Sequence, residues 1–298
     1  MNQPTHGPGG LKYDPAKRTR APEWNVFGAL IVIVLVFEVL NRLNGTSFLF
    51  NMRDNVDAIF NQQRLDIMIL QVAIVGIIAI GVTQVIILGG IDLSSGSIVG
   101  ATAMIVMSFA QTATVNGNPN PKAIFGDWAM DLPVIVPIVA GLACGLLAGL
   151  VNGALIAYTK IPPFIATLGM MVSARGVARW WSNGQPVSFP TESFGRLSNG
   201  DLLGRTSFGL LSWPGQNPAV VFVILAVLFH VIMIYTLYGK RSYAIGSNEA
   251  AARMSGINVD HHKVLVYTIA GILAAVAAVL LTSKNLTAQA GMGVMYEL

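Results

Sequence analysis

The sequence Leu88-Gly89-Gly90-Ile91-Asp92-Leu93-Ser94-Ser95-Gly96-Ser97 separates two apolar runs, residues 67–88 before it and residues 98–110 after it. The paired glycines can adopt positive φ angles and end a helix. Asp92, Ser94 and Ser95 are residue types that start a helix well. The stretch therefore predicts a break between two membrane helices, where irregular backbone must be buried in protein or line a wet cavity.

Two interpretations of Asp92 stay open. The residue can cap the second helix in a short loop at the membrane surface, and the N-cap preference alone explains an aspartate there. Alternatively, Asp92 takes part directly in the passage of a solute, since an ionisable group inside a membrane is costly and is by default a functional candidate.

Composition places the chain among integral membrane proteins with several spans. Only 11% of its 298 residues are charged, against about 25% in a soluble domain, and its mean hydropathy is +0.64. The net charge of +4 does not indicate nucleic-acid binding, because basic residues gather in the cytoplasmic loops of membrane proteins. The single cysteine, Cys144, excludes a disulfide framework. The four histidines show no metal-ligand spacing, so we expect neither metal nor cofactor.

The predicted fold is all-α, a polytopic transmembrane bundle of about seven to eight hydrophobic segments. Residues 1–23 are polar and rich in proline and are expected to form a disordered cytoplasmic tail. Residues 24–298 form the transmembrane domain. Seven expected spans cover about residues 26–43, 67–88, 94–110, 132–158, 164–181, 219–237 and 264–281.

Lysine and arginine predict the orientation. The N-terminal tail and the loop at residues 238–263 are rich in basic residues, whereas the loops at residues 111–131 and 182–217 are poor in them. An N-terminus in the cytoplasm places both basic regions inside, as the positive-inside rule requires.

The expected fourth span carries four glycines at intervals of four residues. Residues at i and i+4 share one helix face, so the bare stripe lets another helix approach closely, as in GxxxG packing. We interpret the stripe as a packing surface. Its members are Gly141, Gly145, Gly149 and Gly153.

Residues 248–256 predict a short helix in a cytoplasmic loop, with Asn248 as its cap and Gly256 as its end. Such a helix suits docking into a groove of a partner, although a surface helix that packs only on its own protein is the alternative. Arg253 offers a charge to an acidic rim. We expect substitutions in this helix to be more damaging than substitutions at Ser198 in the long loop.

Catalytic motifs are not evident. No phosphate-binding G-x-x-x-x-G-K-[ST] sequence occurs, so ATP must act through another chain if it drives this protein. Ser95 or Ser97 with His230 would supply the nucleophile and base of a hydrolase, but no third group that would orient the histidine is visible. We therefore do not expect a hydrolase.

Three stretches resemble the permeases of ribose/xylose/galactoside-type ABC importers, in the same order. The first is residues 81–97. The second runs from Val151 through Ile161-Pro162-Pro163 to Met170, and the third comprises residues 243–251 with Ser255-Gly256-Ile257. The resemblance covers most of residues 26–298.

This resemblance implies a type-II importer-like fold and a sugar or polyol as the solute. It implies two permease copies in the inner membrane, a cytoplasmic ABC ATPase and a periplasmic sugar-binding protein. Relatives continue past a sequence like Tyr296-Glu297-Leu298 into further spans, so we expect the C-terminal spans to be missing from this chain.

The resemblance assigns two groups of functional residues. The candidate helix break and translocation pathway comprises Gly89, Gly90, Asp92, Ser94 and Thr167. The third stretch corresponds to the ATPase-coupling loop, although Gly256 falls one place late for the pattern Glu-Ala-Ala-x-x-x-Gly. The candidate coupling residues are Asn248, Glu249, Ala250, Ala251, Arg253 and Gly256.

An ion- or proton-coupled secondary carrier is the alternative. Such carriers favour discontinuous helices near the midplane and often contain inverted repeats. Asp92 fits that description, but no second Gly-Gly-x-Asp sequence follows it in the chain.

Overall fold

The computed structural model describes residues 22–45, 48–50, 62–200, 206–208, 211–213 and 217–297. Contacts within the chain divide it into two units, Met1–Arg64 and Leu65–Leu298. The disordered tail predicted for residues 1–23 lies outside the described residues, apart from Pro22 and Glu23, which begin the first helix.

The first unit contains helix α1, Pro22–Leu43. Near the end of α1, the buried carboxylate of Glu38 accepts hydrogen bonds from the backbone N–H groups of Leu49 at 2.7 Å and Phe50 at 3.4 Å. Arg42, one turn later, donates to the other carboxylate oxygen at 3.0 Å. Glu38 thus folds residues 48–50 back onto the end of its own helix.

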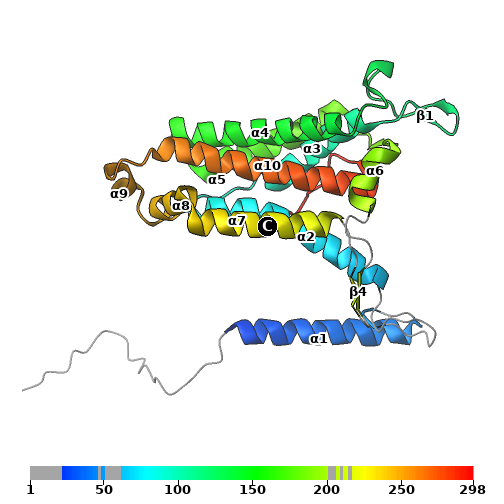
Figure 1. Cartoon of the computed structure of the whole chain (residues 1–298), viewed down its shortest axis with the longest axis horizontal. Helices are drawn as coiled ribbons and strands as arrows, with labels where there is room; N and C mark the ends of the chain where they lie inside the picture. The colour runs from blue at the N-terminus through cyan, green and yellow to red at the C-terminus, as the bar shows by residue number, and fades with distance from the viewer. Residues whose placement is uncertain are drawn as a thin grey trace, which may run out of the picture. The chain divides into compact units, whose positions relative to one another are not determined.

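The second unit is a bundle of helices (Figure 1). Its helices are α2 (Gln62–Ile87), α3 (Ser95–Ala110), α4 (Ile135–Tyr158), α5 (Pro163–Trp181), α6 (Glu192–Asn199), α7 (Asn217–Tyr235), α8 (Leu237–Ser247), α9 (Glu249–Met254) and α10 (Val259–Asn285), with a 3-10 turn η1 at Asp127–Ala129. Short α9 and α8 lie at one end of the bundle and α6 lies at the other. Each of the seven predicted spans corresponds to one of these helices or to α1.

Small antiparallel pairs of strands occur in the loops of this mostly helical chain. β1 (Thr114–Val115) pairs with β2 (Asn118–Pro119), and β3 (Val187–Ser188) pairs with β6 (Thr287–Ala288). β4 (Thr206–Phe208) pairs with β5 (Leu211–Trp213). The β3–β6 pair joins the loop after α5 to the segment after α10, so it brings the C-terminal residues back toward the bundle.

Five of the described helices are long and apolar enough to cross a membrane, namely α1, α2, α4, α7 and α10. Helix α3 has only 16 residues, and α5 is less apolar because it carries Arg175 and Arg179. Length and composition therefore support a polytopic helical membrane protein but do not confirm the predicted seven to eight segments.

The backbones of α4 and α10 lie in close contact along the glycine stripe. Gly141, Gly145, Gly149 and Gly153 all face other helices. A Cβ atom built on Gly149 would lie 2.8 Å from Cα of Thr268, and one on Gly153 would lie 2.7 Å from Cα of Val264. A Cβ on Gly145 would overlap the carbonyl oxygen of Gly271. Because no side chain fits there, the glycines fix the distance between the two helix axes.

Helix α3 forms the centre of the second unit. Fourteen of its sixteen residues are buried, and it packs against α4, α5 and α10. Small residues, among them Gly96 and Gly100, let the C-terminal segment lie directly on α3, where an added Cβ would meet the backbone of Gly293 and Met292. A short helix surrounded by protein in this way does not need the length of a lipid-exposed span.

The contact between α4 and α10 predicts that the stability of the protein depends strongly on the size of the side chain at position 145. Gly145→Leu should lower thermal stability, by about 1–3 kcal/mol or more, because overpacking against backbone cannot relax by a change of rotamer. Gly169→Leu on α5 is the matched control, since nothing lies within 4 Å of a Cβ built there. Thermal unfolding of both variants in detergent measures the difference. Equal stability of the two variants would contradict this packing.

Candidate functional site

The stretch that breaks the chain at residues 88–94 forms a tight turn between α2 and α3. Gly89 has a φ of +83°, a conformation that favours glycine. The N–H of Gly90 donates to the carbonyl of Val85 at 2.9 Å and closes the end of α2. A Cβ on Gly90 would overlap the hydroxyl of Tyr267 on α10. One glycine is thus required for backbone conformation and the other for close approach.

Asp92 organises this turn without being the N-cap of α3. Its Oδ1 accepts the N–H and the hydroxyl of Ser94 at 2.8 and 2.6 Å, and its Oδ2 accepts the hydroxyl of Ser95 at 3.1 Å. The N-cap position is Ser94, whose side chain makes no capping bond. Asp92 is only 5% exposed, so its carboxylate is buried, and it accepts hydrogen bonds from three donor groups of the chain itself.

Two further helices contact the same turn. Asn152 on α4 donates to the hydroxyl of Ser94 at 2.8 Å. Thr167 on α5 donates to the carbonyl oxygens of Pro163 at 2.9 Å and Ile91 at 3.3 Å. The structure therefore brings Gly89, Gly90, Asp92, Ser94 and Thr167 together, and it adds Asn152 and Tyr267 to the group.

Two buried polar atoms beside this turn have no hydrogen-bond partner within the described part of the chain. They are Oδ1 of Asn152 and the hydroxyl of Tyr267. Both side chains are almost completely buried, at 1% and 2% exposure. Asn152 falls in the second stretch that resembles the permeases, but neither residue was predicted to lie at this turn, because each is part of an otherwise regular apolar helix.

A second, partly buried polar cluster lies further along α5. Arg175 on α5 donates through Nε to the hydroxyl of Ser97 at 2.9 Å and forms an ion pair with Glu297. The carboxylate side chain is 10% exposed. Arg175 lies within the span predicted at residues 164–181, one turn deeper than Arg179, and a side chain of this length can extend to the membrane interface. In the structure Arg175 instead points inward, because Ser97 and Glu297 satisfy its guanidinium there.

The helix predicted at residues 248–256 is α9. Oδ1 of Asn248 accepts the N–H of Ala251 at 3.0 Å and caps the helix. Gly256 follows it with a φ of +80°, which allows the chain to turn toward α10. Ala252 is buried against the protein, whereas Ala251 is exposed and Met254 is 91% exposed. One face of α9 thus packs on its own bundle and another is free of it.

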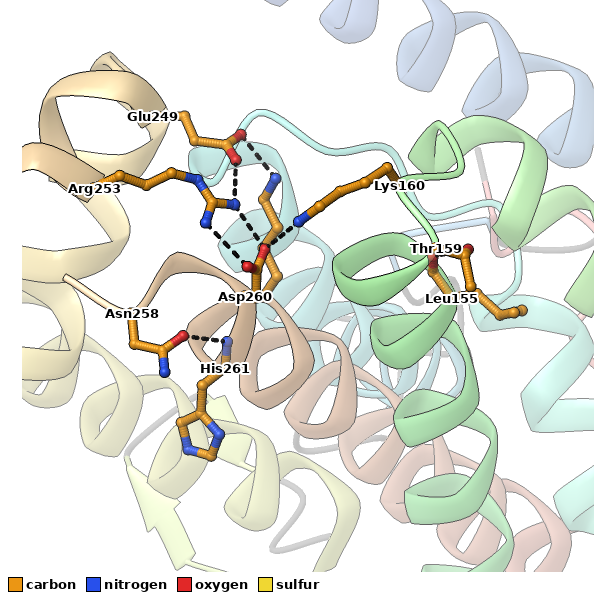
Figure 2. Close-up of polar contacts among 9 residues, drawn as sticks. Leu155, Thr159, Lys160, Glu249, Arg253, Asn258, Asp260 and His261 are labelled. Atoms are coloured by element: carbon orange, nitrogen blue, oxygen red, sulfur yellow. Dashed lines mark hydrogen bonds and ion pairs between the residues drawn. The ribbon is translucent and has the colours of Figure 1, made fainter.

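Two charged side chains of α9 and three from neighbouring segments form a network of ion pairs (Figure 2). Arg253 donates to Glu249 at 2.9 Å and to both carboxylate oxygens of Asp260, at 2.9 and 2.6 Å. Lys263 donates to Glu249 at 2.8 Å, and Lys160 donates to Asp260 at 2.6 Å. Sequence reasoning left Arg253 free to meet an acidic partner. In the structure its charge is already matched by two carboxylates of the chain.

The pairing favours the charged forms of Glu249 and Arg253. The hydrogen bond from Lys263, helped by Arg253, holds the pKa of Glu249 below its usual value. Asp260 and then Glu249 raise the pKa of Arg253 above its ordinary value. A depressed carboxyl pKa contributes stability above the unfolded pKa and loses it as the pH falls. The cluster is therefore fully formed at neutral pH.

Ser198 does not behave as the tolerant loop position that the sequence suggested. It lies in α6, is 1% exposed, and donates its hydroxyl to the carbonyl of Leu280 at 2.7 Å. Its N–H donates to the hydroxyl of Ser283 at 3.1 Å. Substitution there removes a link between α6 and α10, so an exposed residue such as Ala123 is the better control.

The inward-pointing Arg175 predicts an asymmetric response to substitution. Arg175→Ala leaves the mostly buried carboxylate of Glu297 without its cation, and the loss of one partner of such a pair costs about 1–3 kcal/mol. Thermal stability should fall clearly, and Glu297→Gln in the same chain should restore part of it. Arg179→Ala, one turn along on the exposed side of α5, should have little effect. The inward assignment is wrong if the two arginine variants are equally stable.

Comparison with known proteins gives a consistent result. The family described as "Branched-chain amino acid transport system / permease component" matches residues 64–298. The ribose import permease protein RbsC of Bacillus subtilis (strain 168) is 35% identical over 272 residues, which cover 91% of this chain and 72% of the relative. RbsC of Escherichia coli (strain K12) is 31% identical over 273 residues, which cover 91% and 73%.

A galactoside permease is similar over the same region. The galactose/methyl galactoside import permease protein MglC of Salmonella typhimurium (strain LT2) is 30% identical over 279 residues, which cover 92% of this chain and 76% of the relative. No solved structure matches the chain significantly. The family match covers well over half of the chain, and its apolar helices suit a membrane protein. The chain therefore belongs to this family of transport-system permease components and is not an enzyme.

Proposed function

We propose that the chain is the membrane permease subunit of an ATP-binding cassette importer for a sugar or a related polyol. The sugar assignment is supported by the relatives, which are named as ribose and galactoside import permeases over 91–92% of this chain. The observation in the structure that carries the ATP-driven mechanism is α9. It is a short, capped helix in a loop, and ion pairs attach it to the start of α10. One of its faces is exposed and is not covered by the rest of the described chain.

The partners follow from this role. A cytoplasmic ABC ATPase binds the exposed face of α9, where Ala250 and Ala251 permit close approach and Met254 offers an apolar anchor. A periplasmic sugar-binding protein delivers the solute at the opposite end of the bundle, and a second permease copy completes the pathway. This arrangement requires the inner membrane and an N-terminus in the cytoplasm.

The turn at residues 88–94 is proposed to border the translocation pathway. Asp92, Ser94 and Thr167 are buried and hydrogen-bonded in the described conformation. The two unpartnered atoms beside them, on Asn152 and Tyr267, can accept or donate a hydrogen bond if the turn opens. A polar turn with spare hydrogen-bonding capacity suits the passage of a hydroxyl-rich solute.

A branched-chain amino acid is the second candidate solute, because the description of the matching family names one. An ion- or proton-coupled secondary carrier is the second candidate mechanism, because Asp92 is a buried carboxylate beside a helix break. Both alternatives give different results in one transport experiment.

The transport experiment uses the chain with its ATPase and binding protein in proteoliposomes. We expect uptake of a labelled pentose, hexose or polyol that requires ATP and survives an uncoupler. Ala251→Trp should reduce co-purification of the ATPase tenfold or more, because a bulky side chain blocks close approach. Ala123→Trp, at an exposed alanine in the loop after α3, should leave it unchanged.

Other outcomes of this experiment reject the proposal in distinct ways. Uptake that is lost with an uncoupler and does not need ATP would show a secondary carrier. ATP-dependent uptake of leucine or valine, with no uptake of a sugar or polyol, would show an amino acid permease.

Substitutions at Asp92 distinguish a need for its negative charge from a need for a hydrogen-bond acceptor at this position. Asn keeps an oxygen for the N–H and hydroxyl of Ser94 and loses the acceptor for Ser95. If Asp92 only organises the turn, Asp92→Asn should keep most of the transport. Asp92→Ala should lose most of it, because buried donors of Ser94 and Ser95 lose their acceptor at about 1–3 kcal/mol each. Loss of uptake in a folded, assembled Asp92→Asn variant would show that the charge is essential.

A further inference from the structure

Asp260, at the start of α10, binds two elements that are far apart in the sequence. Its carboxylate accepts a bidentate pair of hydrogen bonds from Arg253 on α9, at 2.9 and 2.6 Å. Its Oδ1 also accepts a hydrogen bond from Lys160 at 2.6 Å. Lys160 belongs to the linker between α4 and α5, so one carboxylate joins α9 to that linker (Figure 2).

The linker passes displacements on to α5 because it is short and stiff. Lys160 has a φ of +60°, which a lysine adopts rarely, and Ile161-Pro162-Pro163 follows it. Pro162 is extended, with φ −53° and ψ 136°, and Pro163 is the first residue of α5. Proline fixes φ and restricts the residue before it. The position of Lys160 therefore determines where α5 begins.

Helix α5 in turn carries the side chains that reach the buried polar groups of the bundle. Thr167 donates to the carbonyl of Ile91 in the broken stretch. Arg175, two turns further along, binds Ser97 and pairs with Glu297. A shift of the first turn of α5 along its axis would alter both contacts at once.

The face by which α5 packs is compatible with such a shift. Its buried residues are small: Ala166, Thr167, Ala174 and Ala178. Small side chains interlock little with a neighbouring helix, so most of this face can slide without large side chains leaving their sockets. The exceptions are Met170 and Trp181, which also pack against the core.

The charged cluster is also suited to a contact that moves. The side chains of Lys160, Arg253 and Asp260 are 59%, 40% and 26% exposed. Ion pairs with this degree of solvent exposure stabilise a fold only weakly. Their geometry is nevertheless directional, because the guanidinium of Arg253 holds both oxygens of Asp260.

We propose that Asp260 is a positioning residue that transmits displacement of α9 to α5 through Lys160, and thereby couples the ATPase to the buried turn and the Arg175 site. The proposal rests on the proposed function, in which α9 is the docking site of the ATPase. Lys160 is the test position, because its removal breaks the link to α5 and leaves the Arg253–Asp260 pair intact.

The test compares Lys160→Gln with Lys160→Arg in the complete transporter in proteoliposomes. Three quantities are measured: the ATPase that co-purifies, ATP hydrolysis stimulated by the binding protein, and the solute transported per ATP hydrolysed. Lys160→Gln should keep the first two within twofold of the unsubstituted protein and lower the third fivefold or more. Lys160→Arg keeps a cation for Asp260 and should restore most of the transport per ATP.

Arg196→Gln is the matched control, because Arg196 forms an exposed i,i+4 pair with Glu192 away from α9, on α6. It should leave transport per ATP unchanged. The proposal is overturned if Lys160→Gln transports normally per ATP, or if Lys160→Arg is as defective as Lys160→Gln. It is also overturned if Lys160→Gln loses the ATPase altogether, since its role would then be to hold α9 in place.

The two proposals fail in different ways. If Ala251→Trp releases the ATPase while Lys160→Gln stays fully coupled, only the transmission through Asp260 is wrong. If uptake needs no ATP, the proposed function is wrong and the inference about Asp260 falls with it.

Discussion

Close contact between the backbones of α4 and α10 is the constraint on which the second unit depends. Lipid provides no hydrophobic drive for helix association, so packing at short range must supply it. Glycines on α4 meet Gly271, Thr268 and Val264 of α10, and no side chain separates the two backbones there. This contact sets the distance across which α3 fits, and α3 is buried along almost its whole length as a result.

The same contact aligns the ends of the helices at which the chemistry lies. Since α4 and α10 run side by side in opposite directions, the end of α4 lies beside the start of α10. Lys160 follows α4 and Asp260 begins α10, and the two are therefore within hydrogen-bonding distance although 100 residues separate them. A charged pair at the end of the bundle thus follows from the packing of two helices in opposite directions.

Local features of the fold could be predicted from the sequence, whereas pairings over long distances could not. Asn248 and Gly256 mark the ends of α9 because capping and positive φ are properties of single residues. The i+4 glycine spacing likewise identifies a helix face. Ser198, by contrast, looks like any loop serine, and only the approach of α6 to α10 buries it.

The same distinction between local features and long-range pairings applies to the candidate sites. The break at Gly89-Gly90 and Asp92 is visible in the sequence because two glycines and a carboxylate interrupt an apolar run. Arg175 was visible too, but its direction was not, since Glu297 is 122 residues away. An arginine in a membrane helix can reach the interface or meet an internal partner, and the local sequence is identical in both cases.

Helix α5 differs from its neighbours in what holds it. It presents mainly small residues to the core, together with Met170 and Trp181, and it directs Val172 and Val177 outward. Several of its attachments are polar: the Thr167 hydroxyl on the turn, Arg175 on Ser97 and Glu297, the Trp181 indole N–H on Ser108, and the Lys160 link just before its first residue. Hydrogen bonds and ion pairs can exchange partners over a small displacement, whereas interlocked apolar side chains cannot. A helix held in this way is the part of the bundle that can move without unpacking the α4–α10 core.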